Sequence, residues 1–376
     1  TPAQEHAYLQ PEAGISYIDE EGRVTVEVAG QWTHEDQEQI AHSLALPMDQ
    51  VRVIYPAIGG AFGGREDMSV QIVLALAAYR LHQRGIERPV KIIWSREESI
   101  IGHHKRHPYI LKARWGATKE GKVIAAEVEV IADGGAYAYT SPKVLGNATL
   151  MCTGPYEISN VKVDSYAIYT NNIPGGAFRG FGGPQACFAY EQQMDDIARQ
   201  LCLDPLDVRR VNYLHTGDNT ATGQMIESAA WLEETATRAM AALGEQTPDY
   251  GPVKNGQGFS SYFQSYGRIT WLHDTSQSWV GLELDGTVTV RAGVPDLGAG
   301  QANSLCQIAA EILGVPLERV TIYSTDSALT PLSGTSTATR QLYMSGNATL
   351  MAANTVRNVL LSRASKYFEE EIEALD

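Results

Sequence analysis

Apolar residues recur along the chain with the two spacings that are typical of strands and of helices. Longer alternation at 109–115 and 123–131 flanks the polar turn Lys119–Lys122 and predicts an antiparallel hairpin with extended arms. A second hairpin is predicted over 279–290, where Asp285-Gly286 is a strong turn signal. Shorter strands are expected at 23–28, 51–55 and 320–323.

Helical spacing alternates with these strand segments. Asp204-Pro205 marks the start of one helix, because proline is favoured in a first helical turn. Further helices are predicted at about 68–79, 185–201, 229–243, 304–313 and 345–373. The mixture of strands and helices predicts an α+β architecture.

The length of 376 residues favours two domains. Polar and glycine-rich residues at 216–223 form the best candidate boundary. We therefore predict a first domain at 1–216 and a second domain that begins at 217 and continues to 376. A ligand is expected between two such domains.

Composition excludes several classes of function. The chain has 29 basic and 44 acidic residues and a formal charge of -15, so it lacks the basic surface that nucleic-acid binding requires. It has no apolar run long enough to cross a bilayer, so we expect no membrane partner. The four cysteines show neither metal-ligand spacing nor a dense disulfide pattern, which fits a cytoplasmic protein and places any iron–sulfur cluster on another polypeptide. Because the sequence starts at Thr1, a processed subunit or an excised fragment is expected.

Two glycine-rich tracts carry the most informative chemistry. Each of them, Gly59–Asp67 and Ala177–Gln185, places a phenylalanine and charged side chains among glycines, which lets backbone N–H groups approach a large ligand. A dinucleotide fingerprint would need a further glycine where Gln185 stands. No glycine-lysine-serine/threonine phosphate loop is present either, so the common nucleotide sites are disfavoured.

Three side chains in these tracts have two interpretations each. Glu66 is either a carboxylate presented at a pocket wall or a solvated loop residue. Arg179 is either a donor to carbonyl or phosphate oxygens or a member of a surface ion pair. Phe181 either stacks on a flat ligand or packs in the core.

Other clusters are less specific. His103, His104 and His107 are close in sequence, but adjacent histidines rarely face one ion and the cations between them oppose it, so we expect no metal at this group. The residues Gly298–Gln301 precede an apolar helix, where free N–H groups can meet an anion or a heterocycle. The run Thr335–Thr339 either lines a polar pocket or caps a helix.

Together these tracts resemble the molybdenum-binding subunit of the xanthine dehydrogenase and aldehyde oxidase family. The resemblance begins at Thr1–Glu12 and extends over essentially the whole chain, and Ala-Phe-Arg-Gly-Phe-Gly-Gly-Pro-Gln at Ala177–Gln185 is its most specific motif. The resemblance implies two elongated α+β molybdopterin-binding domains, of which this chain covers the first and the beginning of the second. It also implies a molybdenum–molybdopterin cofactor, whose cytosine dinucleotide form is one option.

The resemblance assigns roles residue by residue. Gln31 matches the glutamine that hydrogen-bonds the metal's oxo group, Arg179 the arginine beside the metal, and Phe181 the aromatic that packs on the substrate. Glu66 matches the carboxylate with which purine-oxidising members bind and polarise substrate, so Gln31, Glu66 and Arg179 are the candidate catalytic residues. No side chain is expected to ligate the metal directly. The remaining expected cofactor contacts are Phe62, Gly63, Ala299, Gly300, Gln301, Ala338 and Thr339.

Three departures from the family pattern matter. Asn147 stands where purine enzymes have a substrate-binding arginine, which makes it a candidate substrate contact. The family's Gly-Gln-Gly reads Gly298-Ala-Gly-Gln301, so the side-chain donor is either displaced or lost. No Gly-Glu-Pro segment with the catalytic glutamate occurs, which implies either a second chain that supplies the base or a module that cannot turn over alone.

The resemblance therefore implies a hydroxylase subunit that inserts water-derived oxygen at an electrophilic carbon of a purine-like or other N-heteroaromatic compound. Electrons would pass to 2Fe–2S and FAD groups on partner chains. An aldehyde oxidoreductase subunit, favoured by Asn147, and a non-catalytic cofactor-binding module, favoured by the missing base, remain open alternatives.

Overall fold

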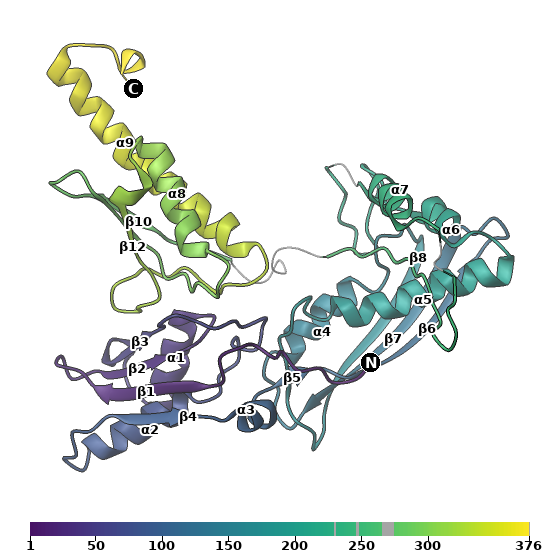
Figure 1. Ribbon diagram of the computed structural model, residues 1–376, viewed down its shortest axis with the longest axis horizontal. Helices are drawn as coiled ribbons and strands as arrows, with labels where there is room; N and C mark the ends of the chain where they lie inside the picture. Colours follow the sequence, from purple (N-terminus) through teal and green to yellow (C-terminus); the bar gives the residue numbers. More distant parts are fainter. Residues whose placement is uncertain (229–230, 246–247, 265–273, 376) are drawn as a thin grey trace. The chain divides into compact units, whose positions relative to one another are not determined.

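The computed structural model describes residues 1–228, 231–245, 248–264 and 274–375 (Figure 1). The chain divides into two compact units, each of which is discontinuous in sequence. The first unit comprises residues 1–4 and the described part of 104–265, and the second unit comprises residues 5–103 and the described part of 266–376. Strands and helices are mixed in both, which confirms the predicted α+β class. The predicted domains 1–216 and 217–376 stay a prediction about sequence modules.

A long three-stranded sheet forms the frame of the first unit. Its strands β6 (Tyr109–Ala117) and β7 (Val123–Gly135) pair antiparallel, which confirms the predicted hairpin, and β8 (Asn160–Tyr169) pairs parallel to β7. Gly121 lies in the hairpin turn with a φ of 85°, a conformation that glycine adopts without strain. Short parallel strands β5 (Lys105–Arg106) and β9 (Gly175–Gly176) complete this unit's strands in the described residues.

Helices pack against this sheet. The helix α5 (Gly183–Leu201) packs on β6, and α4 (Ser141–Leu150) packs on β7 and β8. Asp204 caps α6 (Pro205–Asn212) by accepting hydrogen bonds from the N–H groups of Leu206 and Asp207, so the predicted start of this helix is confirmed. The helix α7 spans Leu232–Leu243, and the first two residues predicted for it, 229–230, lie outside the described residues.

A four-stranded sheet forms one half of the second unit. Its order is β3-β2-β1-β4, with β1 at Ala13–Ile18, β2 at Val24–Val28, β3 at Val51–Ile54 and β4 at Val90–Ile93. The helices α1 (Thr33–Leu44) and α2 (Gln71–His82) pack on this sheet, and their side chains Ile40 and Leu74 are fully buried against Val26 and Val53. A capping box at Ser95 and Glu98 begins α3 (Arg96–Gly102).

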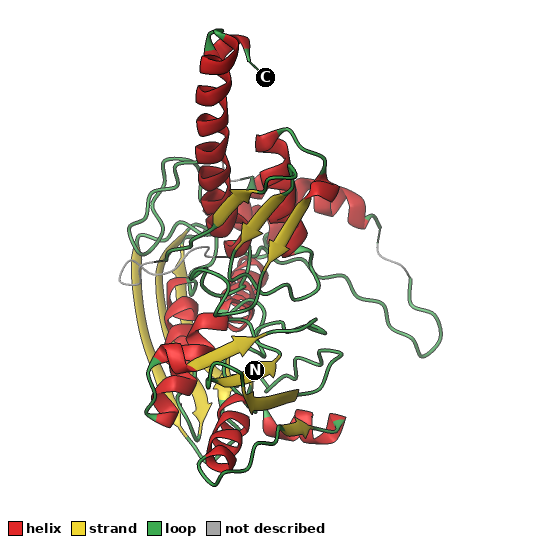
Figure 2. Cartoon of the chain, turned by 90° about the vertical axis from the view of Figure 1, so that its left-hand side faces the viewer, coloured by secondary structure: helices red, strands yellow, loops and turns green. Residues whose placement is uncertain are grey.

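A three-stranded sheet forms the other half of the second unit. The strands β10 (Trp279–Leu282) and β11 (Val288–Arg291) form the predicted hairpin, and β12 (Val320–Tyr323) pairs parallel to β11. The helix α8 (Gln301–Leu313) packs on this sheet and on α9 (Gly346–Phe368), which follows a π-helical turn, Gln341–Ser345. The C-terminal half of α9 extends beyond the sheet in both views (Figures 1 and 2).

The two halves of the second unit repeat one order of elements. In β1–β2–α1–β3 and in β10–β11–α8–β12, an antiparallel hairpin leads into a helix and then into a strand parallel to the hairpin's second strand. Each helix ends at a left-handed residue, and a proline and a single 3-10 turn, Met48–Gln50 or Leu317–Arg319, then precede the last strand. We call these the first and second ββαβ modules.

The two modules are joined through β3. Backbone hydrogen bonds connect Tyr55 N to Thr325 O at 2.8 Å and Ser327 N to Val53 O at 3.0 Å. Arg52 forms an ion pair with Asp326 at 2.6 Å across the same junction. The junction therefore holds together sequence segments that are about 270 residues apart, and it places both helix-entry loops in one unit. Among the described residues, no helix combines the length and the apolar character that are required to cross a bilayer.

Candidate functional site

Gln31 is the centre of the hydrogen bonds that organise the first glycine-rich tract. It follows β2 and precedes α1, and its side chain is only 2% exposed. Its Oε1 accepts from Gly63 N at 3.0 Å and from Arg65 N at 3.2 Å, while its Nε2 donates to Ser336 O at 2.9 Å. Backbone N–H groups only donate and carbonyl oxygens only accept, so these three partners fix the orientation of the amide. Gln31 therefore connects the tract at 59–67 with the run at 335–339.

The first tract turns tightly around this amide. Gly60, Phe62 and Gly63 have φ values of 94°, 54° and 95°, and Phe62 remains 47% exposed in spite of its size. Residues in this conformation can turn their N–H groups toward one concave surface, which suits contact with a ligand. Glu66 follows the turn with 8% of its surface exposed, so it is not the solvated loop residue of the alternative interpretation.

Arg65 stabilises the same turn from within. It is 4% exposed, donates to Gly60 O at 3.0 Å and to Gln10 O at 2.6 Å, and stacks 4.2 Å over the ring of Tyr8. Burial lowers the pKa of this guanidinium, but arginine remains charged at neutral pH. Arg65 therefore has a structural role that its place between glycine and Glu66 does not reveal.

The hydroxyl-rich run at 335–339 is supported by Arg340. This side chain donates to Ser333 O at 2.9 Å, to Thr335 O at 3.2 Å and to Asp274 at 2.6 Å. Ala338 has a φ of 45°, and both Ala338 and Thr339 are exposed. The Oγ1 of Thr335 is buried without a hydrogen-bond partner among the described residues. The residues that start the π-helical turn and α9 are Arg340 and Ser345, so the run itself does not provide the cap of either helix.

The loop before α8 is organised by an acidic residue that none of the sequence motifs includes. Asp296 accepts from Gly298 N at 2.9 Å, from Gly300 N at 3.1 Å and from Ala302 N at 3.4 Å. These N–H groups are therefore already paired, and the carboxylate would repel an anion at this helix start. Ala299 is exposed, whereas Gln301 has a buried Oε1 with no hydrogen-bond partner in the described part of the chain.

The second glycine-rich tract lies in the first unit. Gly180, Phe181 and Gly182 have φ values of 93°, 48° and 88°, and Gly182 is the residue before α5. Asn147, on α4, donates from Nδ2 to Phe181 O at 2.6 Å. Phe181 is partly buried, so it is not a fully buried core residue, and its stacking on a flat ligand stays a prediction. The contact gives Asn147 a positioning role for this turn.

Arg106 supports the start of this tract. It donates to Arg179 O at 2.8 Å and to Gln4 Oε1 at 2.7 Å, and its guanidinium stacks 3.9 Å over the ring of Phe178. Burial lowers the pKa of Arg106 to about 10, so it still carries a charge at neutral pH. The side chain of Arg179 is exposed. The structure therefore fixes the backbone of Arg179 firmly at this turn.

The three clustered histidines face different partners. His103 bonds to Ser99 O and His6, His104 to Ala177 O at 3.2 Å, and His107 to Ser141 Oγ at 2.7 Å. Burial lowers the pKa of His107 to about 4, so it is neutral at physiological pH. The three rings therefore do not share one site.

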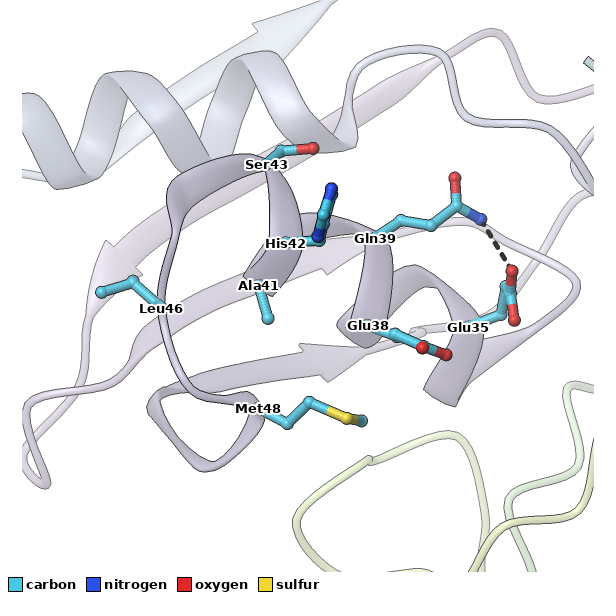
Figure 3. Close-up of a pocket in the computed structure, with 8 residues that line it drawn as sticks. All are labelled: Glu35, Glu38, Gln39, Ala41, His42, Ser43, Leu46 and Met48. Carbon is cyan, nitrogen blue, oxygen red and sulfur yellow. Dashed lines mark hydrogen bonds between the residues drawn. The ribbon is translucent and has the colours of Figure 1, made fainter.

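A surface pocket of about 650 Å³ lies along α1 (Figure 3). Its lining side chains come from α1 and the turn that follows it, and Gln39 donates to Glu35 at 3.3 Å within it. They are Glu35, Glu38, Gln39, Ala41, His42, Ser43, Leu46 and Met48. None of the residues assigned from the sequence belongs to this set, so we do not connect the pocket with the predicted site.

Sequence comparison decides the family. Residues 1–213 and residues 224–376 each match the molybdopterin cofactor-binding domain. The chain belongs to the molybdopterin-binding subunits of the xanthine dehydrogenase and aldehyde oxidase family. The spatial units do not follow these two matches, because residues 5–103 of the first match lie in one unit with most of the second.

Relatives within this family carry the names of enzymes for different compounds. The chain is 45% identical over 234 residues to the nicotinate dehydrogenase large molybdopterin subunit of Eubacterium barkeri, with 62% of this chain and 54% of that protein covered. It is 32% identical over 342 residues to a probable xanthine dehydrogenase subunit of Bacillus subtilis, with 90% of this chain and 45% of that protein covered. The chain therefore spans about half the length of the curated relatives it matches.

Solved structures of the family share the fold. Aldehyde oxidoreductase from Desulfovibrio gigas superposes with a TM-score of 0.79 and 27% identity, covering 94% of this chain and 39% of that chain. A Cu,Mo-CO dehydrogenase superposes with a TM-score of 0.83 and 22% identity over 100% of this chain and 50% of that chain, which supports the fold alone. Two molybdopterin-binding domains of this type are thus the architecture of the chain.

The residues present suit a pterin cofactor. The buried oxygens of Gln301 and Thr335 lack partners among the described residues, and buried polar atoms of this kind are normally hydrogen-bonded. Phe62 and Ala338 hold the left-handed conformation in two tracts that Gln31 connects. Pterin rings offer both donors and acceptors, so a pterin can supply the hydrogen bond that each of these oxygens lacks.

Proposed function

We propose that the chain is part of a molybdenum hydroxylase that inserts water-derived oxygen into an N-heteroaromatic ring. The observation that carries this proposal is Glu66, a carboxylate 8% exposed and presented by the glycine turn that Gln31 holds in place. A carboxylate in that position would accept a hydrogen bond from a ring N–H and orient the heterocycle. The 45% identity to a nicotinate dehydrogenase subunit supports a substrate of this class.

The bound molybdenum cofactor would supply the oxygen-transfer and two-electron chemistry. The chain's own residues would bind and orient it. Gln31 has one Nε2 hydrogen committed to Ser336 O, which leaves the other to donate to an oxygen of the cofactor. The remaining proposed cofactor contacts are Phe62, Gly63, Arg179, Ala299, Gly300, Gln301, Ala338 and Thr339.

Phe181 and Asn147 are the further residues proposed to contact substrate. Phe181, held in its turn by Asn147, would pack against the flat ring. The Asp296 carboxylate, which already accepts from Gly298 N and Gly300 N, disfavours a phosphate at the loop before α8. The side chain of Gln301 would then contact the cofactor at this loop, as expected if it replaces the displaced glutamine of the family pattern.

The general base would come from sequence outside these 376 residues, on the same polypeptide or on a partner chain. No Gly-Glu-Pro segment occurs here, and Glu245, which follows a glycine, has a different context. We further propose that 2Fe–2S and FAD groups on partner chains receive the electrons, that the cofactor is molybdenum–molybdopterin, with the cytosine dinucleotide form as one option, and that the enzyme is cytoplasmic.

An aldehyde oxidoreductase subunit is the second candidate. Asn147 favours it, because this side chain donates to Phe181 O and has no guanidinium with which to pair a purine. The chain is also 28% identical over 381 residues to the aldehyde oxidoreductase of Megalodesulfovibrio gigas, of which it covers 41%.

Glu66→Gln separates the two candidates. In the purified complex, we expect this variant to lower kcat/KM for nicotinate or hypoxanthine by about 10- to 100-fold, because one charge-assisted hydrogen bond is lost. Turnover of benzaldehyde should remain, and Glu38→Gln, on the exposed surface of α1, is the matched control. Unchanged heterocycle kinetics would refute the role of Glu66. Absence of molybdenum and pterin from the complex after maturation-competent expression would instead support a non-catalytic module.

A further inference from the structure

Side chains with metal-binding chemistry meet in the second unit, apart from the residues proposed to contact the cofactor. One ligand atom from each of Glu5, His6 and His103 lies within 4.8 Å of the other two. The two histidines are 6% and 3% exposed, and a second carboxylate, Glu12, is 1% exposed beside them. The set joins the N-terminal segment to His103, the residue that directly follows α3.

The tautomer of His103 follows from its partners. Its Nδ1 lies against the carbonyl oxygen of Ser99, which can only accept, so Nδ1 carries the proton. In a neutral imidazole the other nitrogen, Nε2, then presents a lone pair. A hydrogen bond from Nδ1–H to a backbone carbonyl is also how proteins orient histidines that ligate metals.

Nε2 of His103 lies close to two further potential metal ligands. It lies 3.1 Å from Glu5 Oε1 and 3.3 Å from His6 Nδ1. An ionised carboxylate oxygen cannot donate a hydrogen bond, so its approach to this nitrogen requires either a proton held between Glu5 and Nε2 or a metal ion. Ligand atoms around tetrahedral zinc are about 3.3 Å apart for metal–ligand bonds of about 2.0–2.1 Å, which matches both distances.

A second buried carboxylate lies beside the three residues. Glu12 lies 4.0 Å from His103, its Oε1 accepts from the Tyr8 hydroxyl, and its buried Oε2 has no hydrogen-bond partner among the described residues. Arg65 stacks over the Tyr8 ring, and Arg96 lies close enough to act on Arg65 electrostatically. The unpartnered Glu12 oxygen is therefore the observation beside the three residues that points to a bound cation.

We propose that Glu5, His6 and His103 bind a divalent transition metal ion, with Zn²⁺ the best match to two imidazoles and a carboxylate. The ion has a structural role. A Cβ on Gly64 would meet Tyr8 Cε1 at 2.6 Å and His6 Cγ at 2.9 Å, so the site lies directly against the first glycine-rich tract. Zinc at this point would fix the N-terminal segment beneath the turn that presents Glu66.

Metal titration of the full-length subunit tests the proposal. After treatment with a chelator, Zn²⁺ measured by calorimetry and Co²⁺ measured by its ligand-field absorption should each bind with one ion per chain. His103→Ala and Glu5→Gln should each weaken binding by at least about 10- to 100-fold. His82→Ala is the matched control, because His82 forms an exposed pair with Glu87 at 3.2 Å and should leave the titration unchanged.

Two results would overturn the proposal. The first is absence of stoichiometric binding by the chelator-treated wild type, which would make His103 an imidazolium paired with Glu5. The second is a titration that His103→Ala and Glu5→Gln both leave unchanged. Should His103→Ala not fold, X-ray absorption of the Co²⁺-loaded wild type still decides, because two nitrogen ligands are expected and an all-oxygen shell contradicts the site.

Discussion

The two ββαβ modules of the second unit share one order of elements. The glutamines at the starts of their helices differ in their hydrogen bonds. In the first module, Gln31 has three hydrogen bonds to backbone groups of two distant segments. In the second module, the loop before α8 is organised by Asp296, and Gln301 keeps a buried oxygen without a partner in the described structure. The comparison indicates that the first module fixes the backbone around the proposed site. The second module has a buried oxygen to which a bound ligand can donate a hydrogen bond.

The largest effect is expected for Gln31→Ala. The substitution leaves Gly63 N, Arg65 N and Ser336 O without their partners in a buried place, so the free energy of unfolding should fall by about 3–5 kcal/mol. Chemical denaturation of the cofactor-free protein measures this. Gln39→Ala, which removes one exposed hydrogen bond on α1, should change the same free energy by less than about 0.5 kcal/mol. Similar values for the two variants would show that Gln31 does not hold the first module in shape.

A smaller, pH-dependent effect is expected for the helix that follows Gln31. Asp36, in the first turn of α1, is buried, and desolvation raises its pKa to about 7 although Tyr55 donates to it at 2.6 Å. The folded protein therefore binds this proton more tightly than the unfolded chain does, so stability is highest below about pH 4 and is lost as the pH rises toward 7. Ser304, at the same place in α8, carries no charge.

Asp36→Asn removes that proton linkage. Between about pH 4 and pH 7 the free energy of unfolding of the variant should gain about 2–4 kcal/mol relative to wild type. Denaturation curves at several pH values give the difference, with the exposed Glu38→Gln as control. A constant difference across this range contradicts the raised pKa of Asp36.

Local sequence patterns predicted much of the fold. The hairpins at Lys119–Lys122 and Asp285-Gly286 and the helix after Asp204 have short-range signals, and the structure confirms each. Boundaries were less accurate, because α2 spans Gln71–His82 and not 68–79. The repeated modules could not be read from local patterns, since they share only the order of their elements, while their helix-entry loops differ in length and composition.

The candidate site was only partly predictable. The motifs located both glycine-rich tracts and Gln31, but the bond from Gln31 to Ser336 joins residues 305 positions apart and no local pattern indicates it. Asp296 precedes a glycine-rich turn, which is a signal that could have identified it. Glu5, His6 and His103 could not have been grouped from spacing, because His103 meets its partners only through the fold.

The first module is assigned to fixing the backbone of the site and the second module to ligand binding. The most direct test of this assignment is Gln301→Leu in the full-length subunit, expressed with cofactor maturation. Because the wild-type Oε1 is buried without a partner among the described residues, the apolar substitution should change the stability of the cofactor-free protein by less than about 1 kcal/mol. Molybdenum and pterin per polypeptide, measured in the same preparation, should fall severalfold. Wild-type cofactor content at unchanged stability would contradict the assignment of the second module to ligand binding.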